Sequence, residues 1–272
     1  MPPVNNTMER INNIDYCLQY LMRQEGVEVE VPASLPDKRR LLRALMNVWE
    51  PQPLSEEFLA AQDAELQIQL EERGTVQLQG RGVTLWQGDI TRLRVDAIVN
   101  AANSRMMGCW HPLHACIDNC IHSAAGLQLR AECAEAMSGT ECPPVHPMYE
   151  MNGRIYREAF TNEALITRAY NLPCRHVIHT VGPIVPSGMP TSLQERQLAD
   201  CYRNCFGLAV ANGCHSIAFC CISTGEFRFP NRRAAEIAIE TVREICNPDI
   251  AVVFNVFKDT DYVIYSELLG KN

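Results

Sequence analysis

From Thr75 onward, short apolar segments alternate with amphipathic helical segments, and this alternation restricts the possible folds more than any other feature of the chain. The segment 97–100 is apolar on both faces, which is typical of a strand buried between two layers of helices. Strands that alternate with helices predict a mixed or parallel sheet covered on both faces, an α/β fold. The predicted strands are 76–78, 83–86, 97–100, 164–167, 176–180, 217–222 and 250–256; the predicted helices are 113–137, 192–211, 231–246 and 259–269; and the proline-rich stretch 140–160 is predicted to be a surface loop.

Residues 1–74 show a different, helical pattern. Apolar residues keep helical spacing from Ile11 to Met22, and a second helix is predicted over 37–49. Ser55 has the character of an N-cap for a third helix, which Gly74 ends. We therefore expect an acidic helical extension at 1–74 in front of a main domain at 75–272.

Charge and cysteine content exclude several classes of protein. The chain carries a net charge of −8; residues 1–74 hold 7 Lys/Arg and 13 Asp/Glu, a net of −6, which leaves −2 for the larger part. That part offers no basic face for nucleic acid, and no apolar run approaches the roughly 20 residues of a membrane helix. Thirteen cysteines without a visible signal sequence argue against a disulfide scaffold. A cytoplasmic, reduced protein that uses some cysteines to bind metal is the better interpretation.

The clearest chemical signal is the spacing C-x4-H-x-C formed by Cys109, His114 and Cys116. Thiolates and imidazole are the ligands that zinc prefers, and three protein ligands with an open fourth position are typical of a catalytic zinc site. His111 is a candidate fourth ligand, although a bystander role fits it better. The plainer alternative is two ordinary buried cysteines and a hydrogen-bonded histidine.

Other candidate residues follow predicted strands or begin a helix. Asn103 and Ser223 come after strands, at the edge where α/β sheets bind ligands. The small residues of the turn 222–227 can present backbone N–H groups to an anion such as a diphosphate. Asp118 can act as a base or contact a ribose, or it can be a simple charge at a helix N-terminus, worth about 0.3–1 kcal/mol. No Walker A, G-x-G-x-x-G or H-E-x-x-H pattern is present, which argues against the usual kinases, dehydrogenases and zinc peptidases.

Taken together, the motifs from about residue 75 to 270 resemble the macrodomain, the ADP-ribose-binding fold. The matching segments, in order, are Gln-Gly-Asp-Ile-Thr at 87–91, Val-Asp-Ala-Ile-Val-Asn-Ala-Ala-Asn-Ser at 95–104, Ala-Leu-Ile-Thr at 164–167, Tyr-Asn-Leu-Pro at 170–173, Val-Ile-His-Thr-Val-Gly-Pro at 177–183 and Ile-Ser-Thr-Gly at 222–225. The resemblance implies a mixed six- or seven-stranded sheet sandwiched between helices. It also implies that Asp89 and Ile90 lie at the adenine, Asn103 at the distal ribose and residues 223–227 around the diphosphate.

One departure from the macrodomain pattern points to a particular subfamily. MacroD-type hydrolases carry a glycine tract before a Val-Asp-Gly-Cys-Ile-His segment; here the Cys/His loop replaces the tract, while Ile-Asp-Asn-Cys-Ile-His at 117–122 keeps the tail. The chain is therefore similar to zinc-dependent macrodomains, which remove mono-ADP-ribose from proteins and carry an extra N-terminal helical region. This resemblance makes Asp118 the catalytic aspartate, assisted by Asn103. The implied zinc ligands are Cys109, His114 and Cys116, and the implied ADP-ribose contacts are Asp89, Ile90, Asn103, Cys116, Ile117, Asp118, Asn119, Ser223, Thr224, Gly225, Glu226 and Phe227.

The resemblance implies a zinc-dependent hydrolase of mono-ADP-ribose, attached to protein through an ester of Asp or Glu. Its partners would be ADP-ribose and mono-ADP-ribosylated proteins, with a cognate ADP-ribosyltransferase as a further candidate. Glu226 and Arg228 are larger than the residues expected in their turn, which leaves substrate choice open. The alternatives are a reader that binds ADP-ribose without cleaving it, a deacetylase of O-acetyl-ADP-ribose, and a redox or metal sensor. Serine and arginine linkages remain open as well.

Overall fold

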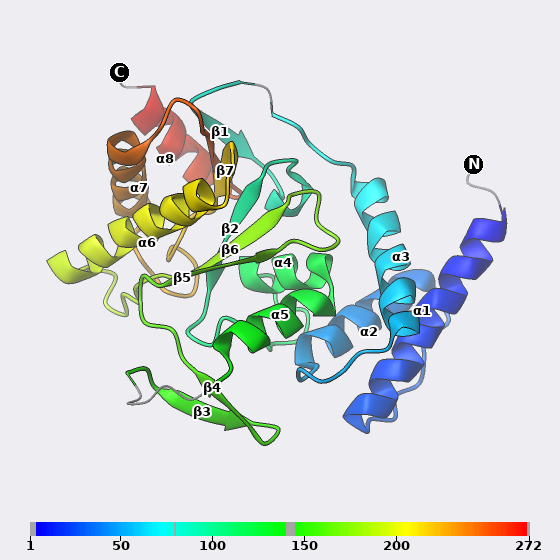
Figure 1. The fold of residues 1–272 in the computed structure, drawn as a ribbon. Helices are drawn as coiled ribbons and strands as arrows, with labels where there is room; N and C mark the ends of the chain where they lie inside the picture. The colour runs from blue at the N-terminus through cyan, green and yellow to red at the C-terminus, as the bar shows by residue number, and fades with distance from the viewer. Residues whose placement is uncertain (1–3, 79, 140–144, 271–272) are drawn as a thin grey trace.

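The computed structural model describes residues 4–78, 80–139 and 145–270 and shows a mixed six-stranded sheet between helices (Figure 1). The strand order is β1-β8-β7-β2-β6-β5, and every neighbouring pair is parallel except β5 with β6. The predicted α/β class and mixed sheet are confirmed. The sheet strands are β1 Val83–Gln87, β2 Ala97–Ala102, β5 Ala164–Arg168, β6 His176–Val181, β7 Ser216–Phe219 and β8 Ala251–Val256.

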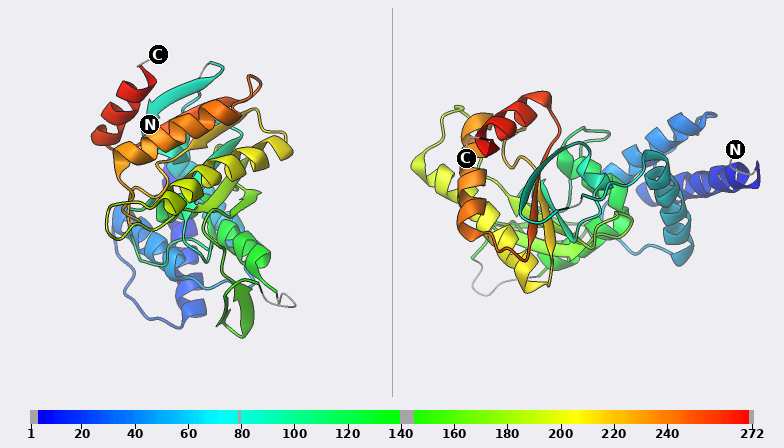
Figure 2. Two further views of the ribbon diagram at one scale, coloured as in Figure 1. Left: turned by 90° about the vertical axis from the view of Figure 1, so that its left-hand side faces the viewer. Right: turned by 90° about the horizontal axis from the view of Figure 1, so that it is seen from above.

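Helices cover both faces of the sheet. One face carries α6, α7 and α8, and the opposite face carries α4 and α5 (Figures 1 and 2). Central strands β2, β7 and β8 are almost wholly buried because both of their faces meet helices. These helices are α4 Ile117–Ala125, α5 Leu127–Met137, α6 Ser192–Ala211, α7 Asn231–Ile245 and α8 Asp259–Leu269, and a short 3₁₀ turn, η1, spans Ile90–Arg92.

The N-terminal helices α1 Val4–Glu25, α2 Leu35–Val48 and α3 Glu56–Arg73 form an outer layer beyond α4 and α5 (Figure 2). They enclose a hydrophobic cluster of their own, which Leu127 of α5 completes. A buried carboxylate, Glu65, receives hydrogen bonds from Arg10 (2.7 and 3.1 Å) and Arg39 (2.8 Å) inside this layer. None of the helices within residues 4–78, 80–139 and 145–270 combines the length and the apolar character that spanning a membrane requires.

Several predicted elements need correction. The single helix predicted over 113–137 is two helices, because Gly126 has a φ of +97°, which a continuous helix cannot contain. Residues 76–78 form no strand; only Val76 makes an isolated bridge, with Leu93. The strand predicted to reach residue 222 ends at Phe219. The predicted 140–160 loop contains a hairpin of β3 Met148–Met151 and β4 Arg154–Arg157, and its residues 140–144 lie outside the described residues.

Candidate active site and metal centre

The candidate site is built on loops that leave one edge of the sheet. Strands β1, β2, β6, β7 and β8 run parallel, so their carboxyl ends share this edge. The loop after β2 carries Asn103 and the Cys/His segment, and the loop after β7 carries the turn 223–227. Asn103 and Ser223, predicted from their positions after strands, therefore do lie at the same sheet edge.

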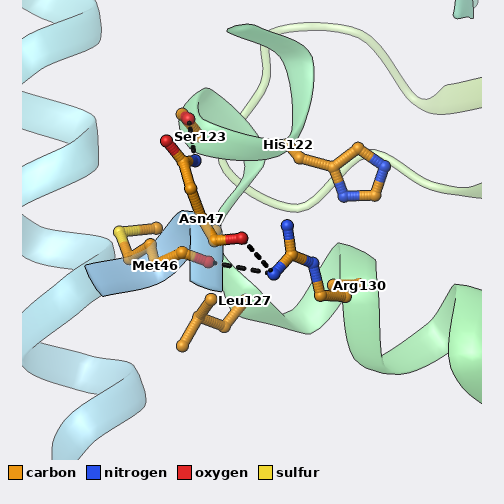
Figure 3. A pocket seen from close by; sticks show the side chains of 7 residues that line it. Met46, Asn47, His122, Ser123, Leu127 and Arg130 are labelled. Atoms are coloured by element: carbon orange, nitrogen blue, oxygen red, sulfur yellow. Dashed lines mark hydrogen bonds between the residues drawn. The ribbon is translucent and has the colours of Figure 1, made fainter. Parts of the chain in front are cut away.

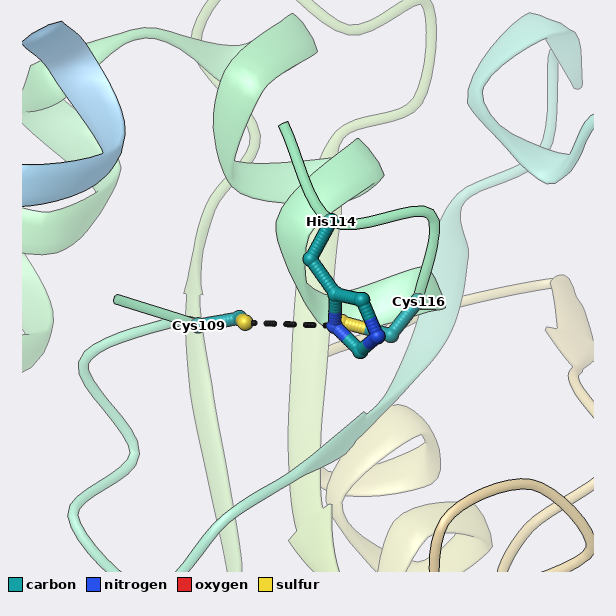
Figure 4. Close-up of side chains that lie close together, drawn as sticks. All are labelled: Cys109, His114 and Cys116. Carbon is teal, nitrogen blue, oxygen red and sulfur yellow. Dashed lines mark hydrogen bonds between the residues drawn. The ribbon is translucent and has the colours of Figure 1, made fainter. Parts of the chain in front are cut away.

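The predicted metal ligands come together in space. The ligand atoms of Cys109, His114 and Cys116 all lie within 4.8 Å of one another, and Cys109 Sγ lies 3.5 Å from His114 Nδ1 (Figure 4). Around a tetrahedral zinc ion, ligand atoms at the usual zinc–sulfur and zinc–nitrogen distances are separated by about 3.3–3.8 Å. His111 is exposed, and its ring stands 5.8 Å from that of His114. The described geometry therefore fits a zinc site with three protein ligands.

Without a cation nearby, the surroundings of Cys116 favour the protonated thiol. Burial raises the pKa of this thiol to about 12; the Asn119 backbone amide acts in the opposite sense, and neighbouring Cys109 adds to the rise. Two thiols held this close disfavour two negative charges unless a cation neutralises them. A dication bound between them would supply that charge and favour the thiolates, and two thiols with one imidazole are a donor set that zinc accepts.

Asp118, the predicted catalytic aspartate, lies in the first turn of α4 and is only 4% exposed. Its Oδ1 accepts a hydrogen bond from Asn100 Nδ2 (2.7 Å), and its Oδ2 accepts one from Asn103 Nδ2 (3.3 Å). Burial raises the pKa of Asp118 to about 6, while the Asn100 hydrogen bond and the charge of Arg130 act to lower it. The carboxylate is thus held in one orientation by two amide side chains.

Asn103 connects the Asp118 carboxylate to residues 109–116, the candidate metal loop. The same Nδ2 that reaches Asp118 donates to the Gly108 carbonyl oxygen at 3.0 Å, and Gly108 is the residue before the candidate ligand Cys109. Gly108 has a φ of +83°, and an added Cβ would lie 2.8 Å from the His122 ring. The path of the chain into the metal loop is therefore tightly defined on the side facing α4.

A buried polar network behind Asp118 fixes its partner Asn100. Asn100 Nδ2 lies 3.0 Å from His179 Nδ1, and His179 Nε2 lies 3.1 Å from Thr167 Oγ1 and 3.6 Å from Cys133 Sγ. Burial lowers the pKa of His179 to about 3, so the ring is neutral; it accepts from Asn100 at Nδ1 and donates at Nε2. His122, Cys133 and His179 also have metal-ligand spacing. Both His179 nitrogens are already engaged, so this ring orients Asn100. The two buried His122 nitrogens accept or donate no hydrogen bond among the described residues, and Nε2 lies 3.6 Å from Asp118 Oδ1.

The turn 223–227 has the shape of an anion-binding turn. Ser223 has a φ of +65°, unusual for a residue with a side chain, and its buried hydroxyl has no hydrogen-bond partner among the described residues. Within the described part of the chain, nothing accepts a hydrogen bond from the backbone amides of Gly225, Glu226 or Phe227. Successive amides without acceptors at a strand-to-helix connection are suited to bind phosphate oxygens.

Two further predicted residues have partners that the sequence did not reveal. Asp89 caps η1: its Oδ1 accepts from the Thr91 amide (3.0 Å), while its Oδ2 pairs with Arg73 of α3 at 3.2 Å. The exposed carboxylate of Glu226 comes within 3.8 Å of His114 Nε2, which brings the anion turn next to the metal loop. Ile90, the first residue of η1, is buried.

Several residues that support the site were not among those predicted from the sequence. Asn100 had a signal, because it is a polar residue inside an otherwise apolar strand. Arg43 and Asn47, on α2, had none: they contact the metal loop only because the N-terminal layer packs there. Asn119, predicted to contact ligand, has its side chain occupied internally; Nδ2 donates to the His111 carbonyl oxygen (2.9 Å), and Oδ1 accepts from Arg43 at 2.8 Å.

Comparison with known proteins identifies the family of the chain. Residues 99–238 match the family described as Macro domain. The chain is 46% identical over 271 residues to the protein-ADP-ribose hydrolase of Treponema medium, covering 94% of this chain and 97% of the relative. It is 41% identical over 283 residues to the protein of the same name from Staphylococcus aureus strain MRSA252, covering 97% and 99%.

Solved structures show the same fold. The Oceanobacillus iheyensis macrodomain with ADP is 37% identical, with a TM-score of 0.58, covering 68% of this chain and 88% of that one. The Trypanosoma brucei macrodomain in complex with ADP-ribose is 27% identical, with a TM-score of 0.60, covering 84% and 95%. The sheet order, the loops at its carboxyl edge and these similarities lead to one assignment: the chain belongs to the macrodomain family.

Proposed function

We propose that this chain is a zinc-dependent hydrolase that removes mono-ADP-ribose from modified proteins. The observation that carries the proposal is the meeting, at one sheet edge, of the Cys109–His114–Cys116 ligand set, the Asp118 carboxylate bound by Asn103, and the open amides of the turn 223–227. The relatives named protein-ADP-ribose hydrolase match this chain over nearly its full length, including the N-terminal helices, which supports a shared activity.

In this proposal, ADP-ribose lies along the carboxyl edge of the sheet. Asp89 and Ile90 contact the adenine, and the distal ribose lies against Asn103, shielded by Phe227. The open amides of the turn bind the diphosphate, since backbone N–H groups and a following helix N-terminus favour negative charge. The proposed contacts are completed by Ser223, Thr224, Gly225 and Glu226 in the turn and by Cys116 and Ile117 at the start of α4, where the fully buried Asn119 supports the segment.

In the proposed reaction, a water molecule and the anomeric carbon of the distal ribose lie beside Asp118. Zinc held by Cys109, His114 and Cys116 would supply Lewis-acid stabilisation of the charge that develops there. The water oxygen forms a bond to the anomeric carbon while Asp118 accepts one of its protons. The bond from that carbon to the acceptor oxygen breaks, and the electron pair leaves with the acceptor carboxylate. Asn100 and Asn103 hold the Asp118 oxygens in position throughout.

The proposed linkage is an ester on Asp or Glu, because such esters are labile and a carboxylate is a good leaving group. The cytoplasm is the proposed location; it keeps thiols reduced, and all described cysteines are free. The proposed domain organisation is a helical extension at 1–74 followed by a main domain at 75–272. The proposed functional partner is an ADP-ribosyltransferase that modifies the same target protein.

The test is release of ADP-ribose from an acceptor modified on acidic residues, measured with the protein as purified, after chelation, and after zinc is added back. We expect activity to be lost and then restored. Acceptors modified on serine or arginine, and O-acetyl-ADP-ribose, run in parallel to define the bond that is cleaved. Binding of ADP-ribose without release in any condition would make the chain a reader instead.

Two variants separate the roles of the site. Cys116→Ala should bind less zinc and lose turnover, whereas Asp118→Asn should keep zinc and ADP-ribose binding but lose at least about a hundredfold in rate. Cys246→Ala, which changes an exposed cysteine outside the site, is the matched control. A Cys116→Ala protein that binds zinc and hydrolyses substrate like the parent would refute the proposed metal site.

A further inference from the structure

The metal loop 109–116 has no regular secondary structure to maintain its shape. Leu113, in its middle, has a φ of +59°, a left-handed conformation that costs a residue with a side chain about 1 kcal/mol or more. Such a conformation persists only where surrounding contacts impose it. The contacts that impose this conformation therefore decide whether the ligand atoms of Cys109, His114 and Cys116 come together.

Arg43, on the N-terminal helix α2, contacts the loop at a ligand residue. Its Nη2 donates to the backbone carbonyl oxygen of His114 at 2.9 Å. Its Nε and Nη2 also donate to Asn119 Oδ1, at 3.2 and 2.8 Å. With Oδ1 bound in this way, the Asn119 Nδ2 group points to the His111 carbonyl oxygen, 2.9 Å away. One guanidinium thus fixes the loop directly and through Asn119.

Asn47 lies one helical turn after Arg43, on the same side of α2. Its Oδ1 accepts a hydrogen bond from the backbone amide of Leu113 at 2.9 Å, so it binds the strained residue itself. Its Nδ2 donates to Ser123 Oγ on α4 at 3.0 Å, which holds the amide in place (Figure 3). Asn47 is 1% exposed, and these two hydrogen bonds fix its side chain between the loop and α4.

We propose that Arg43 and Asn47 are positioning residues through which the N-terminal helices set the geometry of the metal loop. This inference rests on the zinc site of the proposed function and extends it to a region with no metal ligand of its own. The two side chains bond the backbones of adjacent residues, Leu113 and His114, so their loss allows the loop to relax and moves the His114 ring away from the two thiols. General packing of α2 on α4 would not require polar contacts at these two positions.

The experiment measures zinc affinity of the full-length protein by competition with a chromophoric chelator, together with the visible absorption spectrum of the Co²⁺-loaded protein. The variants are Arg43→Ala, Asn47→Ala and the double variant. Arg40→Ala, an exposed arginine on the same helix, is the matched control. Groups that orient metal ligands typically change metal affinity by 10–100-fold when removed. We expect about tenfold weaker zinc binding for each single variant, a larger loss for the double variant, and no change for the control.

The measurements are made well below the melting temperature of each variant, which circular dichroism determines, so that loss of fold is not mistaken for loss of zinc. Reduced affinity with an altered Co²⁺ spectrum, and hydrolysis restored by excess zinc, would support the inference. Parent-like zinc affinity in the folded double variant would overturn it while leaving the proposed function standing. A parent protein that binds no zinc would refute the metal site, and this inference with it.

Discussion

Arg130 is the side chain whose removal we expect to affect stability most. It is 2% exposed, and its Nη1 donates to three backbone carbonyl oxygens at the C-terminal end of α2, those of Met46 (3.2 Å), Asn47 (2.9 Å) and Trp49 (2.9 Å). Figure 3 shows the guanidinium reaching from α5 to the end of α2. Carbonyls at the end of a helix have no partner within the helix, so Arg130 satisfies them across the joint between the N-terminal helices and the sheet domain.

The size of the effect follows from these contacts. Arg130→Leu leaves three buried carbonyl oxygens without a donor, at about 1 kcal/mol each at the lower end of the usual range. It also removes the guanidinium from the face of Trp110, 4.3 Å from the ring centre, a contact worth about 0.5–2 kcal/mol. Burial lowers the pKa of Arg130 to about 10, which shows that the cation is costly to bury, and relief of that cost offsets part of the loss. We therefore expect a net loss of about 3 kcal/mol in the free energy of unfolding.

Urea unfolding followed by tryptophan fluorescence measures this loss, because two of the three tryptophans, Trp49 and Trp110, contact Arg130. With an m value of about 3 kcal/mol per M, the midpoint of the transition should fall by about 1 M. Arg196→Leu, at an exposed position on α6, is the control and should change stability by less than about 0.5 kcal/mol. A loss below about 1 kcal/mol for Arg130→Leu would refute the reasoning.

Two further predictions concern the site edge and the sheet. In Gly182→Ala the new Cβ would lie 2.0 Å from Ser223 Oγ and 2.9 Å from Ile222 Cγ2, so these buried side chains at the start of the anion turn must move. Calorimetric titration should show ADP-ribose binding weakened about tenfold or more, whereas Gly207→Ala, where the Cβ meets nothing within 4 Å, should bind normally. Burial alone would raise the pKa of Asp96, but hydrogen bonds, first of all from the His215 backbone amide, outweigh it and lower the pKa. A lowered folded-state pKa adds stability that is present above about pH 4 and is lost as the pH falls through the folded-state value. The difference in unfolding free energy between the parent and Asp96→Asn should therefore shrink in acid, and a difference independent of pH would contradict this account.

Local residue patterns were sufficient to predict the fold class and most of the helices and strands. The apolar run of β2, the N-cap Ser55 and the alternation of strands and helices predicted the α/β class and most elements to within a few residues. The pattern failed where a single residue's backbone conformation decided the outcome. Gly126, with its positive φ, divides one amphipathic pattern into α4 and α5, and periodicity does not report that conformation.

The spacing of Cys109, His114 and Cys116 favours a metal-binding loop, because these residues lie within eight positions of one another, and the structure brings their ligand atoms within 4.8 Å. What surrounds Asp118 was not predictable in the same way. Asn100, His179 and Thr167 come from three different strands, and their hydrogen bonds exist only because β2, β6 and β5 are neighbours in the sheet.

The sequence alone thus determined the kinds of groups in the site, since a thiol, an imidazole or a carboxylate brings its chemistry wherever it lies. Only the tertiary structure decided how those groups are held. Arg43 and Arg130 lie 71 and 21 residues from the backbone carbonyls they bond in the metal loop. Contacts of this range depend on the packing of whole helices, because a hydrogen bond needs its two atoms placed within a few tenths of an ångström, and no local pattern carries that information.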